Sequence, residues 1–80
     1  MLLTYTQFKV LRGIEGYGYM HEISKRANVT YGHVFKIMND FVSLGLVLKG
    51  KINGRICKVS LTDKGVRVLD LYLEVYQLLK

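Results

Sequence analysis

The sequence of 80 residues predicts a single α+β domain made of three helices, a two-stranded β-hairpin and a fourth helix. Two patterns carry this prediction. Apolar residues recur at helical spacing in four segments, and the dipeptide Asn53-Gly54 separates two short runs in which apolar and polar residues alternate. A chain of this size buries only about 60% of its unfolded surface, so its core is sufficient but thin.

The first helix is expected from residue 4 to about Glu15. Thr4 and Gln7 fit a capping box, in which each side chain bonds to the backbone amide of the other residue. The glycines of "EGYGY" should end the helix. Its buried face follows at three-residue spacing with Phe8, Leu11 and Ile14.

A second and a third helix are expected on either side of the short segment "NVT", residues 28–30. The second, at about 20–27, turns Ile23 and Ala27 inward and leaves Lys25 and Arg26 in water. Asn28 tolerates a positive φ and is a good helix stop, and Thr30 is a good N-cap. The third helix ends at Gly45 and buries Val34, Ile37, Met38, Phe41 and Leu44. Two helices joined by so short a turn form a helix-turn-helix.

The hairpin should occupy residues 46–61. If Asn53-Gly54 form a two-residue type I′ loop, Ile52 faces Arg55 and Leu48 faces Val59. One face then packs on the core and carries Leu46, Leu48, Cys57, Val59 and Leu61. The other face carries Lys49, Lys51, Ile56 and Lys58, so the lysines line the solvent side of a projecting ribbon.

The last helix, residues 63–80, should begin after the capping residue Thr62, with Asp63 in its first turn. Its apolar residues cover far more of the helix than the ~100° stripe that one packing face needs. We assign one face to the domain's own core, with Val66, Leu69, Leu73 and Tyr76. A second seam, like that of a coiled coil, predicts a homodimer through Val68, Tyr72, Val75 and Leu79.

The net charge of +6 lies entirely in the middle of the chain. Residues 23–61 hold seven basic residues and one acid, 7 − 1 = +6, and the rest of the chain holds five of each, 5 − 5 = 0. A segregated basic field attracts a polyanion, of which nucleic acid is the commonest in a cytoplasm. The alternative is a solvated surface with surplus lysines.

The exposed face of the third helix holds the candidate base contacts, because residues near the start of a recognition helix reach base edges. Tyr31 and His33 can hydrogen-bond to bases or phosphates, Lys36 can neutralise a phosphate, and Gly32 lets the backbone approach closely. Phe35 lies at the edge of this face and either covers the hairpin or touches a thymine methyl. The full predicted set is Thr30, Tyr31, Gly32, His33, Lys36 and Asn39.

The hairpin supplies the second candidate contact surface. Its predicted DNA-binding residues are Lys49, Lys51, Asn53, Gly54, Arg55 and Lys58. Lysines there would meet phosphates, and Arg55 at the turn can enter a narrow minor groove. The alternative is a charged edge that prevents edge-to-edge strand pairing.

The predicted order of elements is that of a winged helix-turn-helix: three helices, a hairpin and a last helix. The basic excess lies on the third helix and the hairpin. Three segments, "LTYTQFKVL" (3–11), "VTYGHVFKIMNDFVSLGLV" (29–47) and "NGRICKVSLTDKG" (53–65), resemble MarR-type winged-helix regulators in order and spacing. The resemblance runs from Leu3 to Leu69. Its most specific part is the wing and its exit: Asn53, Arg55, Val59, Leu61, Thr62 and Gly65.

This resemblance implies a regulator of transcription that binds double-stranded DNA, with the third helix in the major groove and the wing arginine at the minor groove. The family usually has Asp at the position of Asn53. Its long flanking helices, which build its dimer and shelter a small-molecule pocket, correspond here to one C-terminal helix, so we do not expect a small-molecule effector. In compactness the chain is also similar to small winged-helix proteins of archaea and their viruses.

Other classes of protein find no support in the sequence. It shows no nucleophile-base pair, phosphate loop or metal-ligand spacing, so we expect neither an enzyme nor a cofactor. One cysteine forms no internal disulfide. No sustained apolar run predicts a membrane span or a secretory signal, so we expect a cytoplasmic, nucleoid-associated protein. A protein-interaction module and a non-specific, chromatin-like coating protein remain the alternatives to a specific regulator.

Overall fold

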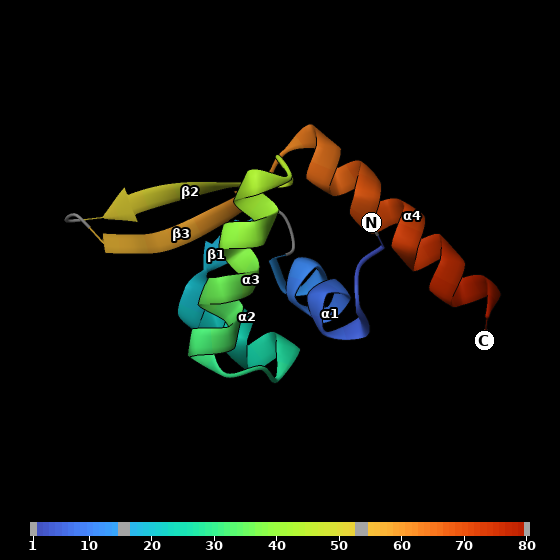
Figure 1. Ribbon diagram of the computed structural model, residues 1–80, viewed down its shortest axis with the longest axis horizontal. Coiled ribbons are helices and arrows are strands. Elements are labelled where there is room, and N and C mark those ends of the chain that lie inside the picture. Colours follow the sequence, from blue (N-terminus) through green and yellow to red (C-terminus); the bar gives the residue numbers. More distant parts are fainter. Residues whose placement is uncertain (1, 15–16, 53–54, 80) are drawn as a thin grey trace.

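The computed structural model describes residues 2–14, 17–52 and 55–79, and for Tyr17, 51–52 and 55–57 it describes the backbone only. In chain order the described elements are α1 (Tyr5–Ile14), β1 (Tyr17–Tyr19), α2 (Met20–Ala27), α3 (Tyr31–Ser43), β2 (Val47–Ile52), β3 (Arg55–Leu61) and α4 (Asp63–Leu78) (Figure 1). The predicted α+β fold, with three helices, a hairpin and a last helix, is confirmed.

The sheet has one strand more than the sequence predicts. Its order is β1-β3-β2, and β1 pairs antiparallel with β3, Tyr17 opposite Ser60 and Tyr19 opposite Lys58. The glycines of residues 15–19 predict the end of a helix and not a strand. Three residues are too few for a recognisable alternation, and β1 forms only because β3 is there to pair with it.

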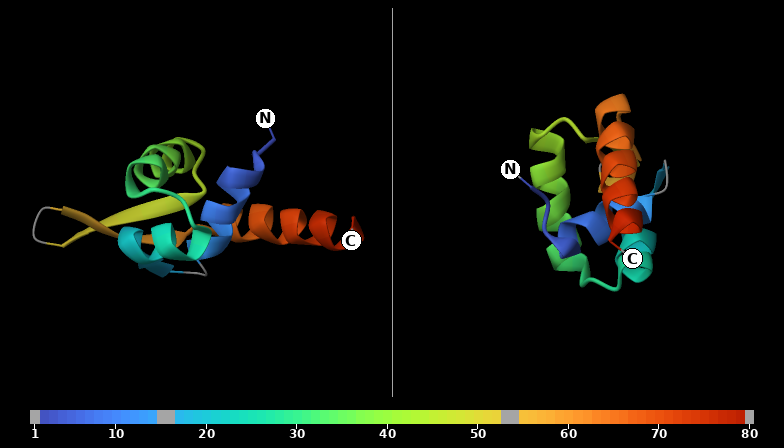
Figure 2. Two further views of the ribbon diagram at one scale, coloured as in Figure 1. Left: turned by 90° about the horizontal axis from the view of Figure 1, so that it is seen from below. Right: turned by 90° about the vertical axis from the view of Figure 1, so that its right-hand side faces the viewer.

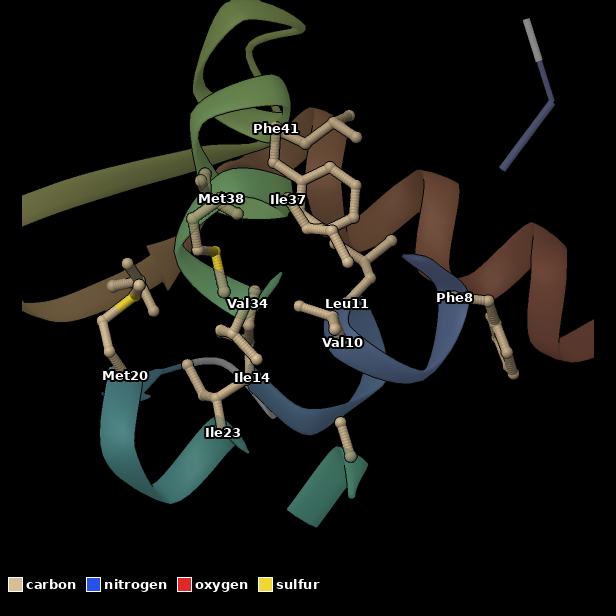
Figure 3. Packing of buried hydrophobic residues seen from close by; sticks show 14 of the residues in the cluster. Phe8, Val10, Leu11, Ile14, Met20, Ile23, Val34, Ile37, Met38 and Phe41 are labelled. Atoms are coloured by element: carbon tan, nitrogen blue, oxygen red, sulfur yellow. The ribbon is translucent and has the colours of Figure 1, made fainter. Parts of the chain in front are cut away.

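The core lies where α1, α2 and α3 meet over the sheet (Figure 3). The predicted inward residues of the three helices are confirmed: each of Phe8, Leu11, Ile14, Ile23, Ala27, Val34, Ile37, Met38 and Phe41 is at most 4% exposed. Leu44 is the exception. It is the C-cap of α3 and is partly exposed, since the helix has ended before this residue could turn inward. Burying each large side chain contributes roughly 1.5–3 kcal/mol.

The helix ends follow local sequence signals. The amide of Thr4 donates to Gln7 Oε1 (2.9 Å) and the amide of Gln7 donates to Thr4 Oγ1 (3.1 Å), which confirms the predicted capping box. Asn28 ends α2 in the left-handed conformation, with φ 56° and ψ 48°. Gly45 follows α3 with φ 75°. At Asn28 the chain changes direction between the two helices of the helix-turn-helix, and at Gly45 it changes direction between α3 and the wing.

One face of α4 packs on α1, largely through aromatic rings. Phe8 stacks on Tyr76 at 4.4 Å between ring centroids, and the amide of Leu3 donates to the Tyr72 hydroxyl (2.7 Å). Leu69 is buried, and Leu73 and Tyr76 pack against the core, as predicted. Val66 is 44% exposed, so its assignment to the core is wrong. The face toward α1 is centred on Leu69 and Tyr76, and Val66 lies to one side of it.

The hairpin of β2 and β3 projects past the helices on one side, and the C-terminal half of α4 extends away on the other (Figures 1 and 2). The molecule measures 42 × 24 × 20 Å. Among the described residues, no helix could cross a bilayer and no cluster of metal-ligating side chains occurs.

Candidate nucleic-acid interface

One face of α3 packs against the core, and the opposite face is exposed. Val34, Ile37, Met38 and Phe41 are almost fully buried. The 3.6-residue period then leaves an outward stripe. The exposed predicted contacts on this outer face are Tyr31, Gly32, His33, Lys36 and Asn39. In the described part of the chain, the side chains of Tyr31, His33 and Lys36 make no hydrogen bond or ion pair.

The turn before α3 is fixed by a hydrogen bond, and no side chain caps the first amides of the helix. The hydroxyl of Ser24 donates to Val29 O (2.5 Å), which ties the turn to α2. Thr30 is the N-cap residue, as predicted, but its side chain makes no capping hydrogen bond. The first-turn amides of a helix have no partner within the helix. Thr30 and the amides that follow it are therefore available to an external acceptor.

The wing pairs in a different register from the predicted one. Ile52 faces Arg55, as expected for a two-residue loop, but Lys49 faces Val59 and Leu48 faces Ser60. The ladder shifts between Gly50 and Lys51, which is a β-bulge. Gly50 pairs with Lys58 and Lys51 with Ile56, so the extra residue is Cys57 of β3. It reverses which β2 side chains share a face with Val59. The predictions that Leu48 lies in the core and that Lys49 points outward are both wrong: Leu48 is 63% exposed.

Lys49 consequently points toward α3. Its ammonium donates a hydrogen bond to Asn39 Oδ1 and lies 5.2 Å from the centre of the Phe35 ring. Phe35 is 38% exposed, and its ring faces a hairpin residue, which favours the first of the two predicted roles. Lys49 thus links the wing to the outer face of the recognition helix, and the side chain is half-buried.

The other predicted wing residues are placed only in part. Lys58 in β3 is half-buried and lies between Gly50 of β2 and Tyr19 of β1. The backbones of Lys51 and Arg55 belong to the ladder, opposite Ile56 and Ile52. Asn53 and Gly54 lie outside the described residues, as do the side chains of Lys51 and Arg55. Their roles at the wing tip stay predictions.

The root of the wing is locked to the start of α4. Thr62 Oγ1 donates to Gly45 O (2.6 Å) and accepts from the Gly65 amide (3.0 Å). Lys64 Nζ donates to Leu44 O (2.9 Å), and the Thr62 amide donates to Leu46 O (3.0 Å). The residues of the wing exit that resemble the family therefore hold α3, the wing and α4 in one arrangement.

One cation of the central basic segment serves the fold. Arg26 donates to Gly13 O (2.8 Å) and forms an ion pair of 3.5 Å with Glu22. Its side chain is 39% exposed, so the prediction that Arg26 simply lies in water is incomplete. The guanidinium joins the end of α1 to α2. It contributes less to an external field than the sequence count implies.

The predicted dimer seam on α4 divides into two parts. Val75 and Leu79 are 51% and 77% exposed. Val68 and Tyr72 pack partly against the domain's own core, and the Tyr72 ring lies 6.1 Å from that of Phe8. Beside Val75 and Leu79, the helix also exposes Leu71 (50%) and Leu78 (79%). These four residues form an apolar patch, called here the α4 outer stripe.

A three-helix core with a helix-turn-helix, a β-hairpin wing and a buttressed wing root defines a winged helix-turn-helix protein. Comparison with solved structures identifies the type of winged helix. It is a MarR-like winged helix, similar to transcriptional regulators of that type. No protein-family model matches the sequence, and no characterised protein matches it significantly.

The transcriptional regulator BldR from Sulfolobus solfataricus is 29% identical, with a TM-score of 0.84 over 96% of this chain and 58% of its own. A cysteine-to-serine mutant of MarR from E. coli, complexed with operator DNA, is 26% identical, with a TM-score of 0.74 over 86% of this chain and 52% of its own. BpsR from Bordetella bronchiseptica, whose DNA binding is regulated by 6-hydroxynicotinic acid, is 19% identical, with a TM-score of 0.87 over 94% and 60%. The chain thus spans about 50–60% of the lengths of these neighbours.

Two features of this surface were not predicted from the sequence. The contact of Lys49 with Asn39 depends on the bulge, whose extra residue is Cys57 of β3. Gly50 lies beside it on β2, and a glycine inside a strand is a recognised sign of a bulge. The bond from Lys64 to the α3 C-terminus has no signal in the sequence, because it joins residues 20 apart that are separated by the whole hairpin. Both features belong to the junction between α3 and the wing.

Proposed function

We propose that the protein is a sequence-specific regulator of transcription that binds double-stranded DNA as a homodimer. In this proposal α3 enters the major groove, the wing follows the backbone and the minor groove, and the protein works in the cytoplasm on the nucleoid. The chain binds and does not catalyse. The similarity to regulators, one of them complexed with operator DNA, supports this class of function.

One observation carries the proposal. The outer face of α3 presents Tyr31, His33 and Lys36 to solvent without internal partners among the described residues, directly beside a hairpin of basic sequence. Side chains that the fold neither buries nor bonds are available to a ligand, and these supply hydrogen bonds and positive charge. An α-helix with such a face fits the width of the major groove.

The experiment that tests DNA binding is selection of duplexes from a random-sequence pool. Recovery of a palindrome, with two half-sites about one helical turn apart, would support specific binding by a dimer. Recovery of duplexes without any common sequence would indicate a chromatin-like coating protein. Failure to retain any duplex at low salt would contradict the proposal and favour a protein-interaction module.

The α4 outer stripe supports the homodimer. An exposed, contiguous apolar patch on one helix is typical of an interaction surface, and a second copy of the same chain supplies the same patch by two-fold symmetry. In this arrangement Val75 and Leu79 form the centre of the contact. Val68 and Tyr72 flank it, because they are partly used by the domain's own core.

Light scattering at micromolar concentration tests the dimer. The double variant with Val75→Asp and Leu79→Asp should be a folded monomer with much weaker DNA binding. Tyr72 is unsuitable for this test because its ring and hydroxyl hold the N-terminus of the chain. Val66→Asp is the matched control, since Val66 is 44% exposed on another side of α4. A monomeric wild-type protein would contradict the dimer.

A further inference from the structure

We propose that Lys49 determines which base Asn39 recognises. Its bond to the amide oxygen leaves Asn39 to act as a hydrogen-bond donor, so that Asn39 favours guanine or thymine over adenine. This inference rests on the proposed function, and it assigns a specificity role to a residue of the wing that the sequence predicts to be a phosphate contact.

The chemistry of lysine settles the orientation of the Asn39 amide. An ammonium group has three donors and no acceptor, so the Asn39 atom that it bonds must be the oxygen Oδ1. The Nδ2 amino group then points away from Lys49. Asn39 is exposed on the same stripe of α3 as Gly32 and Lys36, so the amino group faces the surface proposed to meet the major groove.

Lys49 is held in place from two sides. Phe35 and Asn39 are one helical turn apart on α3 and therefore lie next to each other. The ring of Phe35 lies 5.2 Å from the ammonium, and the Asn39 oxygen accepts its hydrogen bond. The backbone of Lys49 is paired opposite Val59, which is 1% exposed, so the strand is anchored to the core. The bulge at Cys57 of β3 places Lys49 opposite Val59, and this turns the Lys49 side chain toward α3.

The orientation of the amide decides the base. Free asparagine reads adenine with two bonds, its oxygen accepting from N6 and its amino group donating to N7. The amide oxygen has a second lone pair. With Lys49 bonded to the first, that pairing would bring the adenine amino group, a donor, close to an ammonium, and this repulsion disfavours adenine. Guanine offers the acceptors O6 and N7, and thymine offers O4, so each accepts from the Asn39 amino group without this conflict.

The test uses selection from random duplex DNA with the full chain, comparing wild type, Asn39→Ala, Lys49→Met and the double variant. Asn39→Ala identifies the base pair that depends on Asn39, because preference is lost there. At this pair wild type should favour guanine or thymine over adenine by about 2- to 10-fold, as expected for one net hydrogen bond. Lys49→Met keeps an apolar chain beside Phe35 and removes the donor.

With the donor gone, Lys49→Met should shift this one base pair toward adenine and leave the others unchanged. The double variant should have the preference of Asn39→Ala. Lys51→Met is the matched control, since it removes the same charge from the same strand and should not change the preference at this pair. The inference is overturned if Lys49→Met keeps the wild-type preference while weakening binding to all sequences, or if Asn39→Ala changes no base pair.

A second measurement separates this inference from the proposed function. In the protein without DNA, nitrogen-15 relaxation of the Asn39 side-chain amide should report an ordered group, and Lys49→Met should make it mobile. Equal mobility in the two proteins would overturn the inference whatever the DNA result. A wild-type protein that recovers no duplex would contradict the proposed function, while recovered duplexes without the adenine shift would contradict the Lys49 inference alone.

Discussion

Gly65 at the wing root and Gly32 at the start of α3 occupy the same kind of place, the first turn of a helix, in opposite surroundings. A Cβ atom built on Gly65 would lie 2.0 Å from Leu46 O and 3.0 Å from Leu46 C. One built on Gly32 would have no heavy atom within 4 Å. The fold itself requires glycine at position 65, where backbone meets backbone. At position 32 the fold makes no such demand.

The same contrast runs through the two regions. At the wing root, Thr62 and Lys64 bond to the carbonyls of Gly45 and Leu44 and so serve the fold. On the outer face of α3, Tyr31 and His33 have no comparable partner among the described residues. Both regions lie in segments that resemble the MarR family. A resemblance in sequence therefore combines residues that build the wing with residues that are free to contact a ligand.

Gly65→Ala should have the largest effect on stability. The new methyl group would clash with the Leu46 carbonyl, and relief of the clash requires α4 to move away from the segment that leads into β2. We expect a loss on the order of 3 kcal/mol in the free energy of unfolding, measured by urea denaturation. A variant as stable as wild type would show that position 65 of α4 does not closely contact the Leu46 backbone.

Thr62→Val should lower the free energy of unfolding by less than Gly65→Ala does. It keeps the shape of the side chain but removes the hydroxyl that accepts from the Gly65 amide and donates to Gly45 O. Loss of an N-cap of this kind costs about 0.5–2 kcal/mol in the free energy of unfolding. Thr62→Ser is the control, because it retains the hydroxyl and should stay within roughly 0.5 kcal/mol of wild type.

Gly32→Ala should act in the opposite direction on stability and still impair function. Alanine in a helix is more stable than glycine by roughly 0.5–1 kcal/mol, and the methyl group meets no neighbour within the chain. If the α3 backbone approaches DNA at this point, the same methyl group should lower duplex affinity by about fivefold, the cost of one hydrogen bond. Unchanged affinity, measured by fluorescence anisotropy, would remove Gly32 from the interface.

Local signals in the sequence were sufficient for the helices. The spacing of apolar residues gave the buried faces, except for Leu44 and Val66. The capping residues Thr4, Asn28 and Thr62 gave the helix ends, because these features depend on neighbours within a few residues. The order of elements then gave the winged helix. The exposure of the candidate contact residues on the outer face of α3 could be predicted for the same reason.

Features that depend on pairing between distant segments could not be predicted in the same way. The strand β1 exists through its pairing with β3 about 40 residues away. The bulge at Cys57 of β3, across from Gly50 and Lys51, put Leu48 on the surface and turned Lys49 toward α3, against the register that a regular hairpin requires. One extra residue in β3 changes which side chains of β2 lie on the same face as Val59, and the strand glycine Gly50 was the only sign of it in the sequence.

Salt-dependent binding tests most directly the claim that α3 and the wing meet DNA. Log affinity for duplex DNA should fall linearly with log salt, and each lost phosphate contact should reduce the slope by about 0.9. Lys51→Ala and Arg55→Ala should each lower the slope, and Arg55→Ala should also weaken any preference for A·T-rich flanks. Arg67→Ala, which removes an exposed cation from α4, should leave the slope unchanged. Isotherms in which Lys51→Ala and Arg55→Ala match wild type at every salt concentration would contradict the account, because the wing would then not touch DNA.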